Sequence, residues 1–188
     1  SMKLIHWKLT GKTDEYMVKE VEVPMMRMPL IFLETRVEKL DAVVGTHPHE
    51  DHIGSLDAVL YSFDVDTVML PKRTLKSKSY KDVIQAIETT QTALIHPQPG
   101  DTFSLGEDQF VVLGPLSEDY SEVNNSSLVL RYVHGQTSIL FTGDMQAKSE
   151  KDILDSYAPV QANILKAPHH GSDTSSTQAF LEAVKPQD

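Results

Sequence analysis

Cysteine is absent from the 188-residue chain, and its absence excludes both disulfide bonds and thiolate metal sites. Any bound metal ion must therefore be held by His, Asp, Glu or Asn. The chain also lacks an apolar run approaching the ~20 residues that span a bilayer. Residues 1–10 lack the basic start, apolar stretch and small-residue cleavage site of a signal peptide. The sequence thus predicts no membrane segment in this chain. The compartment stays open, with the cytoplasm favoured for the chain as given.

Positive charge is scarce. The chain has 17 Lys and Arg against 27 Asp and Glu, which gives a formal net charge of -10. This balance disfavours nucleic acid as a partner, because a large basic footprint is its usual electrostatic signature. It leaves a small-molecule or phosphodiester substrate open, because bound divalent metal ions would supply positive charge locally.

Glycine and proline are also few, at 9 and 10 residues, so low-complexity and collagen-like classes are excluded. The hydrophobic fraction of 40% and the charged fraction of 23% are those of an ordinary globular protein. The length and composition therefore predict one domain over residues 1–188, large enough to bury a core without cross-links.

Histidine, in contrast, is abundant and clustered. Five of the eight His residues fall in two short segments, 47–52 and 169–170. Each segment follows a short apolar stretch that predicts a strand. A third such stretch, 138–142, ends at Asp144. Because ligands gather beyond the carboxyl ends of strands in α/β sheets, these three strand ends are expected to meet at one site.

The rest of the sequence mixes helical and strand patterns. Helical spacing of apolar residues alternates with strand-like runs, and this mixture predicts an α/β fold with mixed sheets. The expected helices cover 53–62, 80–90, 148–157 and 176–184. The expected strands cover 3–10, 17–23, 40–45, 66–70, 93–96, 102–105, 110–113, 127–133, 138–142 and 162–167.

The first His cluster has the spacing of a two-metal site. His47 and His49 are two residues apart, so in extended chain both rings point the same way and can hold one ion. Pro48 between them restricts the backbone. Asp51 and His52 follow the bend and face a second position. Two metal ions about 3.5–4 Å apart would polarise a scissile group and generate hydroxide near neutral pH.

The other candidates are ambiguous when each is taken alone. Asp144 could equally be a turn or helix-capping residue. His169 and His170 could lie in an ordinary loop. We interpret these residues as ligands because polar clusters at three strand ends support one another. Three isolated histidines are expected to be structural or solvent-exposed: His6, His96 and His134.

These segments resemble the metallo-β-lactamase fold superfamily. Thr-His-Pro-His-Glu-Asp-His at 46–52 matches its His-x-His-x-Asp-His motif, and Leu-Phe-Thr-Gly-Asp at 140–144 matches its strand-end Asp motif. His-His-Gly-Ser at 169–172 and Asn-Asn-Ser-Ser at 124–127 look like the hydrolase domain of ComEC-type competence proteins and its stand-alone relatives. The resemblance covers about residues 40–188.

The resemblance implies an αββα sandwich with mixed sheets and a centre of two divalent metal ions, Zn or Mn. The metal ligands that it implies are His47, His49, Asp51, His52, Asp144 and His169. Within this set Asp144 bridges the two ions, and Asp51 also acts in catalysis by orienting the attacking hydroxide. His170 is a second catalytic candidate. It is a proton donor to the leaving group, a substrate contact, or the true ligand in place of His169.

The resemblance also implies that the two metal positions differ. Relatives usually place a third His beside His47 and His49, at a position before Asp144 where this sequence has Asn124 and Asn125. An amide oxygen is a poor zinc ligand but acceptable to harder ions. We therefore predict that the first metal position is weaker, and that manganese is as plausible there as zinc.

Metal-dependent hydrolysis is the function that the resemblance implies. The favoured substrate is a phosphodiester, attacked by a metal-bound hydroxide at the dinuclear His/Asp site. One alternative is hydrolysis of a small ester or lactone at the same site. Another is a catalytically impaired domain that serves in binding or assembly.

Both ends of the chain depart from the family pattern. Residues 1–39 lack its Gly-rich, Asp-containing strand pair and are interpreted as a divergent N-terminal part. The family also continues with another strand and a Gly-His motif, whereas this chain stops at residues 186–188. We therefore expect the C-terminal strand to be absent. An absent strand would expose a sheet edge, which a partner or a second copy in a homo-oligomer would cover.

Overall fold

The computed structural model describes residues 4–5, 18–19 and 38–187. The chain divides into two compact units, Ser1–Leu30 and Ile31–Asp188. All candidate site residues belong to the second unit. Among the described residues, no helix combines the length and apolarity needed to cross a bilayer.

A short strand pair is the described part of the first unit. Strands β1 (Leu4–Ile5) and β2 (Val18–Lys19) pair in antiparallel fashion. Each lies inside a predicted strand, 3–10 or 17–23. The rest of these two predicted strands, and His6, lie outside the described residues.

The second unit contains a three-stranded parallel sheet. Its strands, in the order in which they pair, are β3 (Lys39–Val44), β4 (Asp64–Met69) and β5 (Ala93–Ile95). Parallel strands need crossover connections, and the helices in these connections are α2 (Glu50–Ile53), α3 (Leu56–Ser62) and α4 (Lys78–Thr90). The helices pack on the sheet through a core that includes the fully or almost fully buried Leu60, Val68 and Val83.

The predicted helix 53–62 is two shorter helices, and this changes the setting of the site. Helix α2 begins at Glu50, earlier than predicted, and the chain breaks at Gly54 and Ser55 before α3. The spacing of apolar residues did not predict α2, because its first three residues are polar or charged. Asp51 and His52 therefore lie past the bend, as expected, and belong to a short helix of their own.

A five-stranded mixed sheet forms the rest of the second unit, with the order β10-β9-β8-β7-β6. Its strands are β6 (Thr102–Leu105), β7 (Asp108–Gly114), β8 (Val129–His134), β9 (Thr137–Phe141) and β10 (Ile164–Leu165). Strands β9 and β10 are parallel, and the other neighbours are antiparallel. The helical segments around it are η1 (Val123–Ser126), α5 (Ala147–Asp155), η2 (Pro168–Gly171) and α6 (Gln178–Val184).

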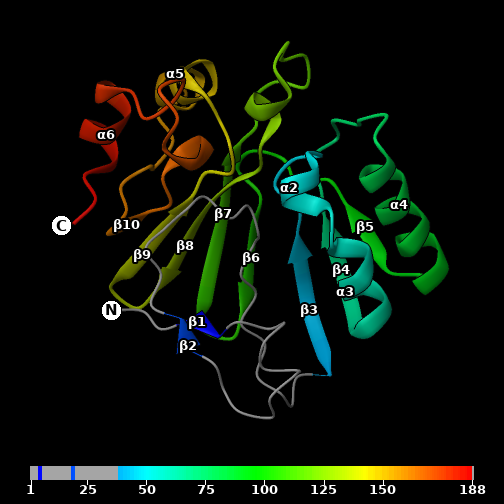
Figure 1. Cartoon of the computed structure of the whole chain (residues 1–188). Helices are drawn as coiled ribbons and strands as arrows, with labels where there is room; N and C mark the ends of the chain where they lie inside the picture. Colours follow the sequence, from blue (N-terminus) through cyan, green and yellow to red (C-terminus); the bar gives the residue numbers. More distant parts are fainter. Residues whose placement is uncertain (1–3, 6–17, 20–37, 188) are drawn as a thin grey trace. The chain divides into compact units, whose positions relative to one another are not determined.

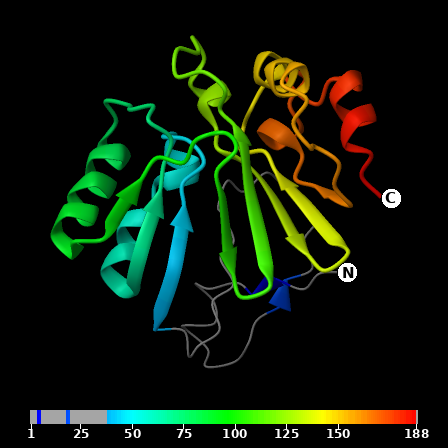
Figure 2. The ribbon, with the colours of Figure 1, turned by 180° about the vertical axis from the view of Figure 1, so that it is seen from behind.

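The predicted fold class is confirmed. In the second unit, α3 and α4 lie against the three-stranded sheet and α5 and α6 against the five-stranded sheet, so the elements follow the order helix, sheet, sheet, helix (Figures 1 and 2). The core beside α5 and α6 includes the fully buried Leu140, Ile153 and Phe180. Most predicted elements are present within a few residues, while the two 3-10 segments, η1 and η2, were not predicted.

The topology brings the polar strand ends to one place. Strands β9 and β10 are parallel, so Asp144 and the His pair after β10 leave the sheet at the same edge. Strand β8 runs the other way, so η1 before it lies at that edge too. The end of β3 joins them, because the backbone N–H of Leu128 donates to the carbonyl oxygen of Thr46 at 2.8 Å.

Strand β10 is an edge of the five-stranded sheet as described. It is two residues long, and its Ile164 is half-exposed. Cover of this edge by a second copy, and the single domain with a divergent N-terminal part and no C-terminal strand, stay predictions.

Candidate metal centre

In the loop after β3, the imidazole rings of His47 and His49 lie close together. His47 is fully buried, and its Nε2 lies 3.0 Å from Nδ1 of His49. The hydroxyl oxygen of Thr46 lies 3.2 Å from Nδ1 of His47 and 3.3 Å from Nδ1 of His52. Thr46 therefore orients two rings so that their Nε2 atoms face the other candidate ligands, an arrangement typical of His metal ligands.

Asp144 lies at the middle of the site and is almost fully buried. Its Oδ2 is 3.1 Å from Nε2 of His52, 3.1 Å from Nε2 of His170 and 3.9 Å from Nε2 of His47. Its Oδ1 is buried and has no hydrogen-bond partner among the described residues, although the ammonium of Lys166 lies 3.6 Å away. A buried carboxylate oxygen of this kind fits a metal ligand better than a structural cap, because an unsatisfied buried oxygen is costly.

Gly143 and Ser127 place Asp144. The backbone N–H of Asp144 donates to Oγ of Ser127 at 3.0 Å. Gly143 has φ +52, and a Cβ there would lie 2.7 Å from Cβ of Ser127 and 3.0 Å from Cβ of Thr46. Only glycine suits this position, because it tolerates both the left-handed conformation and the close approach. The Gly-Asp of the strand-end motif thus has a packing reason as well as a chemical one.

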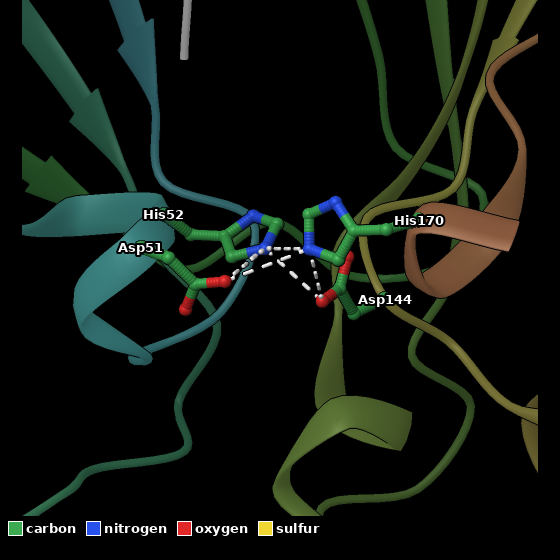
Figure 3. A group of neighbouring side chains, drawn as sticks. All are labelled: Asp51, His52, Asp144 and His170. Atoms are coloured by element: carbon green, nitrogen blue, oxygen red, sulfur yellow. Dashed lines mark hydrogen bonds and ion pairs between the residues drawn. The ribbon is translucent and has the colours of Figure 1, made fainter. Parts of the chain in front are cut away.

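Four side chains bring their ligand atoms together. Asp51, His52, Asp144 and His170 each offer a ligand atom, and these atoms all lie within 4.8 Å of one another (Figure 3). Nε2 of His52 and Nε2 of His170 are 3.3 Å apart, and Oδ2 of Asp51 is 3.5 Å from Nε2 of His170. Two imidazoles and two carboxylates that converge in this way fit zinc, manganese or iron.

The two neighbouring histidines after β10 have different surroundings. His170 faces the four-residue group, whereas His169 turns away from it. Nε2 of His169 lies 3.1 Å from Nδ2 of Asn124, and its Nδ1 lies 2.8 Å from Oγ1 of Thr174. The geometry thus favours His170 over His169 as the ligand from this segment, and the assignment of His169 as a metal ligand stays a prediction.

His169 and His170 both have an unusual backbone conformation. His169 has φ 46 and ψ 46, and His170 has φ 55 and ψ 23, so both lie in the left-handed region. This conformation costs roughly 1–2 kcal/mol for each residue that has a side chain. Strain of this kind is concentrated at functional sites.

The two asparagines before β8 have separate roles. Asn125 is buried, and its Oδ1 accepts from the backbone N–H groups of Gln146 and Ser149 at 2.9 and 3.2 Å. It therefore caps the start of α5. Asn124 instead faces His169, and its Oδ1 is buried without a hydrogen-bond partner in the described part of the chain. Asn124 is thus the one of the pair with a free oxygen close to the His segment.

Charge and burial shape the protonation of the site. Burial and, to a smaller extent, the neighbouring His52 lower the pKa of His47 to about 3. His47 is therefore a neutral imidazole, the form that binds a metal ion. Burial raises the pKa of Asp144, but its hydrogen bond with His52 and the charges of the surrounding histidines lower it more, to well below its usual range. Asp144 is therefore an ionised carboxylate.

Lys166 is a site residue that the sequence pattern did not single out. Its Nζ donates to the carbonyl oxygens of Gly143 and Ala167 at 2.8 and 3.1 Å and lies 3.6 Å from Oδ1 of Asp144. It ties the loop after β9 to the loop after β10. Burial lowers the pKa of Lys166, while Asp144 opposes that effect. The signal available in the sequence was its position at the end of a strand that leads to the His pair.

The isolated histidines that the structure describes have ordinary partners. Nδ1 of His96 lies 2.9 Å from the carbonyl oxygen of Leu70, and Nδ1 of the exposed His134 lies 2.5 Å from Oδ1 of Asp108. Neither residue belongs to the four-residue group. They agree with the structural or exposed roles expected for them.

Comparison with known proteins shows similarity to competence proteins. ComE operon protein 3 of Bacillus subtilis (strain 168) is 32% identical over 151 residues, which cover 80% of this chain and 20% of that protein. Competence protein ComA of Neisseria gonorrhoeae is 38% identical over 79 residues, 42% of this chain and 11% of that protein. The chain thus spans only a small part of these relatives. They confirm the predicted resemblance to competence proteins.

Among solved structures, CmlA, a diiron beta-hydroxylase from Streptomyces venezuelae, matches with 23% identity and a TM-score of 0.45. The match covers 66% of this chain and 24% of that chain. The family model described as Metallo-beta-lactamase superfamily matches residues 15–188. This match extends over far more than half of the sequence and includes every candidate ligand. The chain therefore belongs to the metallo-β-lactamase superfamily.

Proposed function

We propose that the chain is a metal-dependent hydrolase that cleaves a phosphodiester with two divalent metal ions, Zn or Mn. One observation carries the proposal. Oδ2 of Asp144 lies within 3.9 Å of ring nitrogens from His47, His52 and His170, while its Oδ1 is buried without a hydrogen-bond partner in the described residues. A carboxylate shared by imidazoles on both sides fits a ligand that bridges two ions.

The proposed ligands fall into two halves that share Asp144. The α2 half consists of Asp51, His52, Asp144 and His170. The loop half consists of His47, His49 and Asp144. Asn124 offers a buried amide oxygen that could complete the loop half, and such an oxygen suits a hard ion such as manganese better than zinc.

The chemistry that bound metal ions supply is activation of a water molecule and stabilisation of negative charge on the substrate. The residues of the chain orient the ligands and accept a proton from the attacking water. Thr46 fixes the rings of His47 and His52, and Lys166 fixes the loop that carries Asp144. Asp51 is half-buried at the rim and is proposed to orient the attacking water and accept its proton.

His170 has two competing roles. As a ligand, its Nε2 would bind a metal ion and could not carry a proton. As the proton donor to the leaving group, the same atom would have to be protonated. The position of Nε2 among three ligand atoms supports the first role. The exposed face of the ring is compatible with a substrate contact.

The phosphodiester is favoured over an ester or lactone for two reasons. Two-metal sites recur in enzymes that displace groups at phosphorus. The chain also resembles ComEC-type hydrolase domains over the segments 124–127 and 169–172. An ester or lactone hydrolase on the same residues is the second candidate, and a binding or assembly domain with an impaired site is the third.

A parallel assay tests the proposal. The protein, purified without chelator and supplied with Mn²⁺ or Zn²⁺, is expected to hydrolyse bis-p-nitrophenyl phosphate faster than p-nitrophenyl acetate or a lactone panel. Asp144→Asn should abolish the activity, and Asp173→Asn, an exposed carboxylate of the next loop, should not. Faster ester or lactone hydrolysis would select the second candidate. No activity, together with no rise of Tm on adding either ion, would select the third.

A further inference from the structure

Glu150 is a buried acidic residue that the proposed metal centre does not use. It lies on α5 and is fully buried. A buried carboxylate is costly unless hydrogen bonds replace the water that it loses. Its Oε1 accepts from the backbone N–H of Ser176 at 2.5 Å, and its Oε2 accepts from that of Thr177 at 2.9 Å. Both oxygens of Glu150 therefore bind one short segment of backbone.

These two hydrogen bonds are not the cap of α6. Thr177 is the N-cap residue of this helix, and its own Oγ1 accepts from the backbone N–H of Phe180 at 3.3 Å. The N–H groups that Glu150 binds belong to Thr177 and to the residue before it, so they precede the first turn of the helix. Glu150 thus holds the end of the segment that leads from the His pair to α6. We call this segment, residues 168–177, the His loop.

The His loop has an unusual backbone. Three of its non-glycine residues have left-handed conformations: His169 and His170, with φ 46 and 55, and Ser176, with φ 60. Residues with side chains keep this conformation only where the surrounding contacts impose it. Ser176 is one of the two residues that Glu150 binds. The conformation of the loop therefore depends on its contacts with α5.

Ser175 connects the end of the His loop with its beginning. It is buried and directly precedes the two residues that Glu150 binds, and its Oγ donates to the carbonyl oxygen of Pro168 at 2.9 Å. This carbonyl belongs to the peptide group between Pro168 and His169. The hydrogen bond therefore fixes the peptide at which the left-handed His pair begins.

Helix α5 also connects the His loop to Asp144. It begins at Ala147, three residues after Asp144, and the backbone N–H of Ala147 donates to the carbonyl oxygen of Thr174 at 3.0 Å. Glu150 lies about one turn further along the same helix. In Figures 1 and 2 the His loop, coloured orange, lies beside α5 and α6. A single helix thus holds both groups whose ligand atoms, Oδ2 of Asp144 and Nε2 of His170, are 3.1 Å apart.

We propose that Glu150 is a positioning residue that brings His170 to the α2 half of the metal centre. The inference rests on the proposed metal-dependent function. The hydrogen bonds of Glu150 go to backbone N–H groups, so it acts on His170 through the His loop rather than by contact. Loss of one of its acceptor oxygens would let the left-handed pair relax. The ring of His170 would then move away from the other three ligands of that half.

The test measures Mn²⁺ binding to the full chain by calorimetric titration. Glu150→Gln keeps the shape of the side chain but turns an amide N–H group toward a backbone N–H donor. Ser175→Ala removes the hydroxyl that binds the carbonyl of Pro168 and leaves Glu150 in place, so it tests the same path with a smaller change. Ser77→Ala is the control. It removes the N-cap of α4, whose Oγ accepts from the backbone N–H of Tyr80 at 3.2 Å.

Glu150→Gln and Ser175→Ala are each expected to weaken the first, tighter Mn²⁺ binding step by about tenfold or more. The second step, at the loop half, should stay within about twofold of the wild type. The double variant should lose little more than the larger single loss, because both changes break the same path. The control should lower Tm and keep both affinities. Circular dichroism and Tm establish that each variant is folded.

Unchanged affinity of the first step in Glu150→Gln and Ser175→Ala would overturn the proposal, and so would an equal loss in Ser77→Ala. Losses that add in full in the double variant would show two independent effects rather than one path, and a wild type that binds no Mn²⁺ would also overturn it. Failure of a metal-loaded wild type to hydrolyse bis-p-nitrophenyl phosphate would refute the proposed function instead, since the titration measures the position of His170 without catalysis.

Discussion

The α2 half and the loop half of the candidate metal centre share Asp144 but differ in completeness. The α2 half gathers four ligand atoms within 4.8 Å, from a helix and two strand ends. The loop half has two imidazoles from one loop, 3.0 Å apart, and His47 is fully buried. Where relatives are expected to have a third His, this chain has Asn124 and Asn125, and Asn124 faces His169.

This difference predicts the order in which the two halves bind metal ions. A site with two imidazoles and two carboxylates is expected to bind a divalent ion well without help. A site with two imidazoles and a shared carboxylate needs an amide oxygen or water to complete it. The two halves should therefore fill one after the other, the α2 half first.

Loss of Asp144 should have the largest effect, because it belongs to both halves. Asp144→Asn keeps the shape but removes the charge that both ions need. We expect hydrolysis of bis-p-nitrophenyl phosphate to fall by about 1,000-fold or more, and bound metal to fall below one ion per chain by elemental analysis. Retention of two ions would contradict the shared role.

Substitution of His169 and of His170, one at a time, should have very different effects on metal affinity. His170→Asn is expected to lower metal affinity of the α2 half by at least about 100-fold, as measured by calorimetric titration with Mn²⁺. His169→Asn should lower it by no more than about tenfold, because His169 contacts Asn124 and Thr174 rather than the four-residue group. The opposite ranking would make His169 the ligand.

Completion of the loop half should make the two halves more alike. Asn124→His supplies the third imidazole, and we expect zinc affinity of the second, weaker binding step to rise by about tenfold or more. Asn125→His is the matched control. It removes the cap of α5, so it should lower Tm without any gain in zinc affinity. Equal gains from both variants would show that Asn124 does not face the metal position.

Lys166 should have the smallest effect, since it acts on Asp144 through the backbone and through charge. Lys166→Met is expected to weaken metal binding by no more than about tenfold, and Lys166→Arg should retain most of the affinity. Calorimetric titration of both variants measures this. A loss as large as that of Asp144→Asn would make Lys166 part of the reacting centre instead.

Much of the fold could be predicted because its signals are local. Apolar runs and turns marked β3, β4, β6 and β9 within a few residues, and apolar spacing marked α4. The signals failed where polar ligand residues begin a helix, as in α2, and where tight 3-10 turns have no apolar period, as in η1 and η2. In each case polar residues of the site stand where the apolar pattern that predicts an element would be.

The site could be predicted in part. Spacing alone grouped His47, His49, Asp51 and His52, because residues close in sequence stay close in space. Sequence could not decide between His169 and His170, because two successive left-handed residues determine which ring turns inward. The role of Lys166 and the separate roles of Asn124 and Asn125 depend on contacts between segments far apart in sequence, so they emerged only from the structure. The role of Thr46 emerged there too, because no pattern marks the hydroxyl that orients His47 and His52.

The most direct test of the two unequal halves is anomalous X-ray scattering from crystals grown without chelator and with limiting Mn²⁺ or Zn²⁺. The account predicts a strong peak within ligand distance of Asp51, His52, Asp144 and His170. A weaker peak should lie beside His47 and His49. No peak, a stronger peak at the loop half, or a metal ion bound by His169 would contradict it.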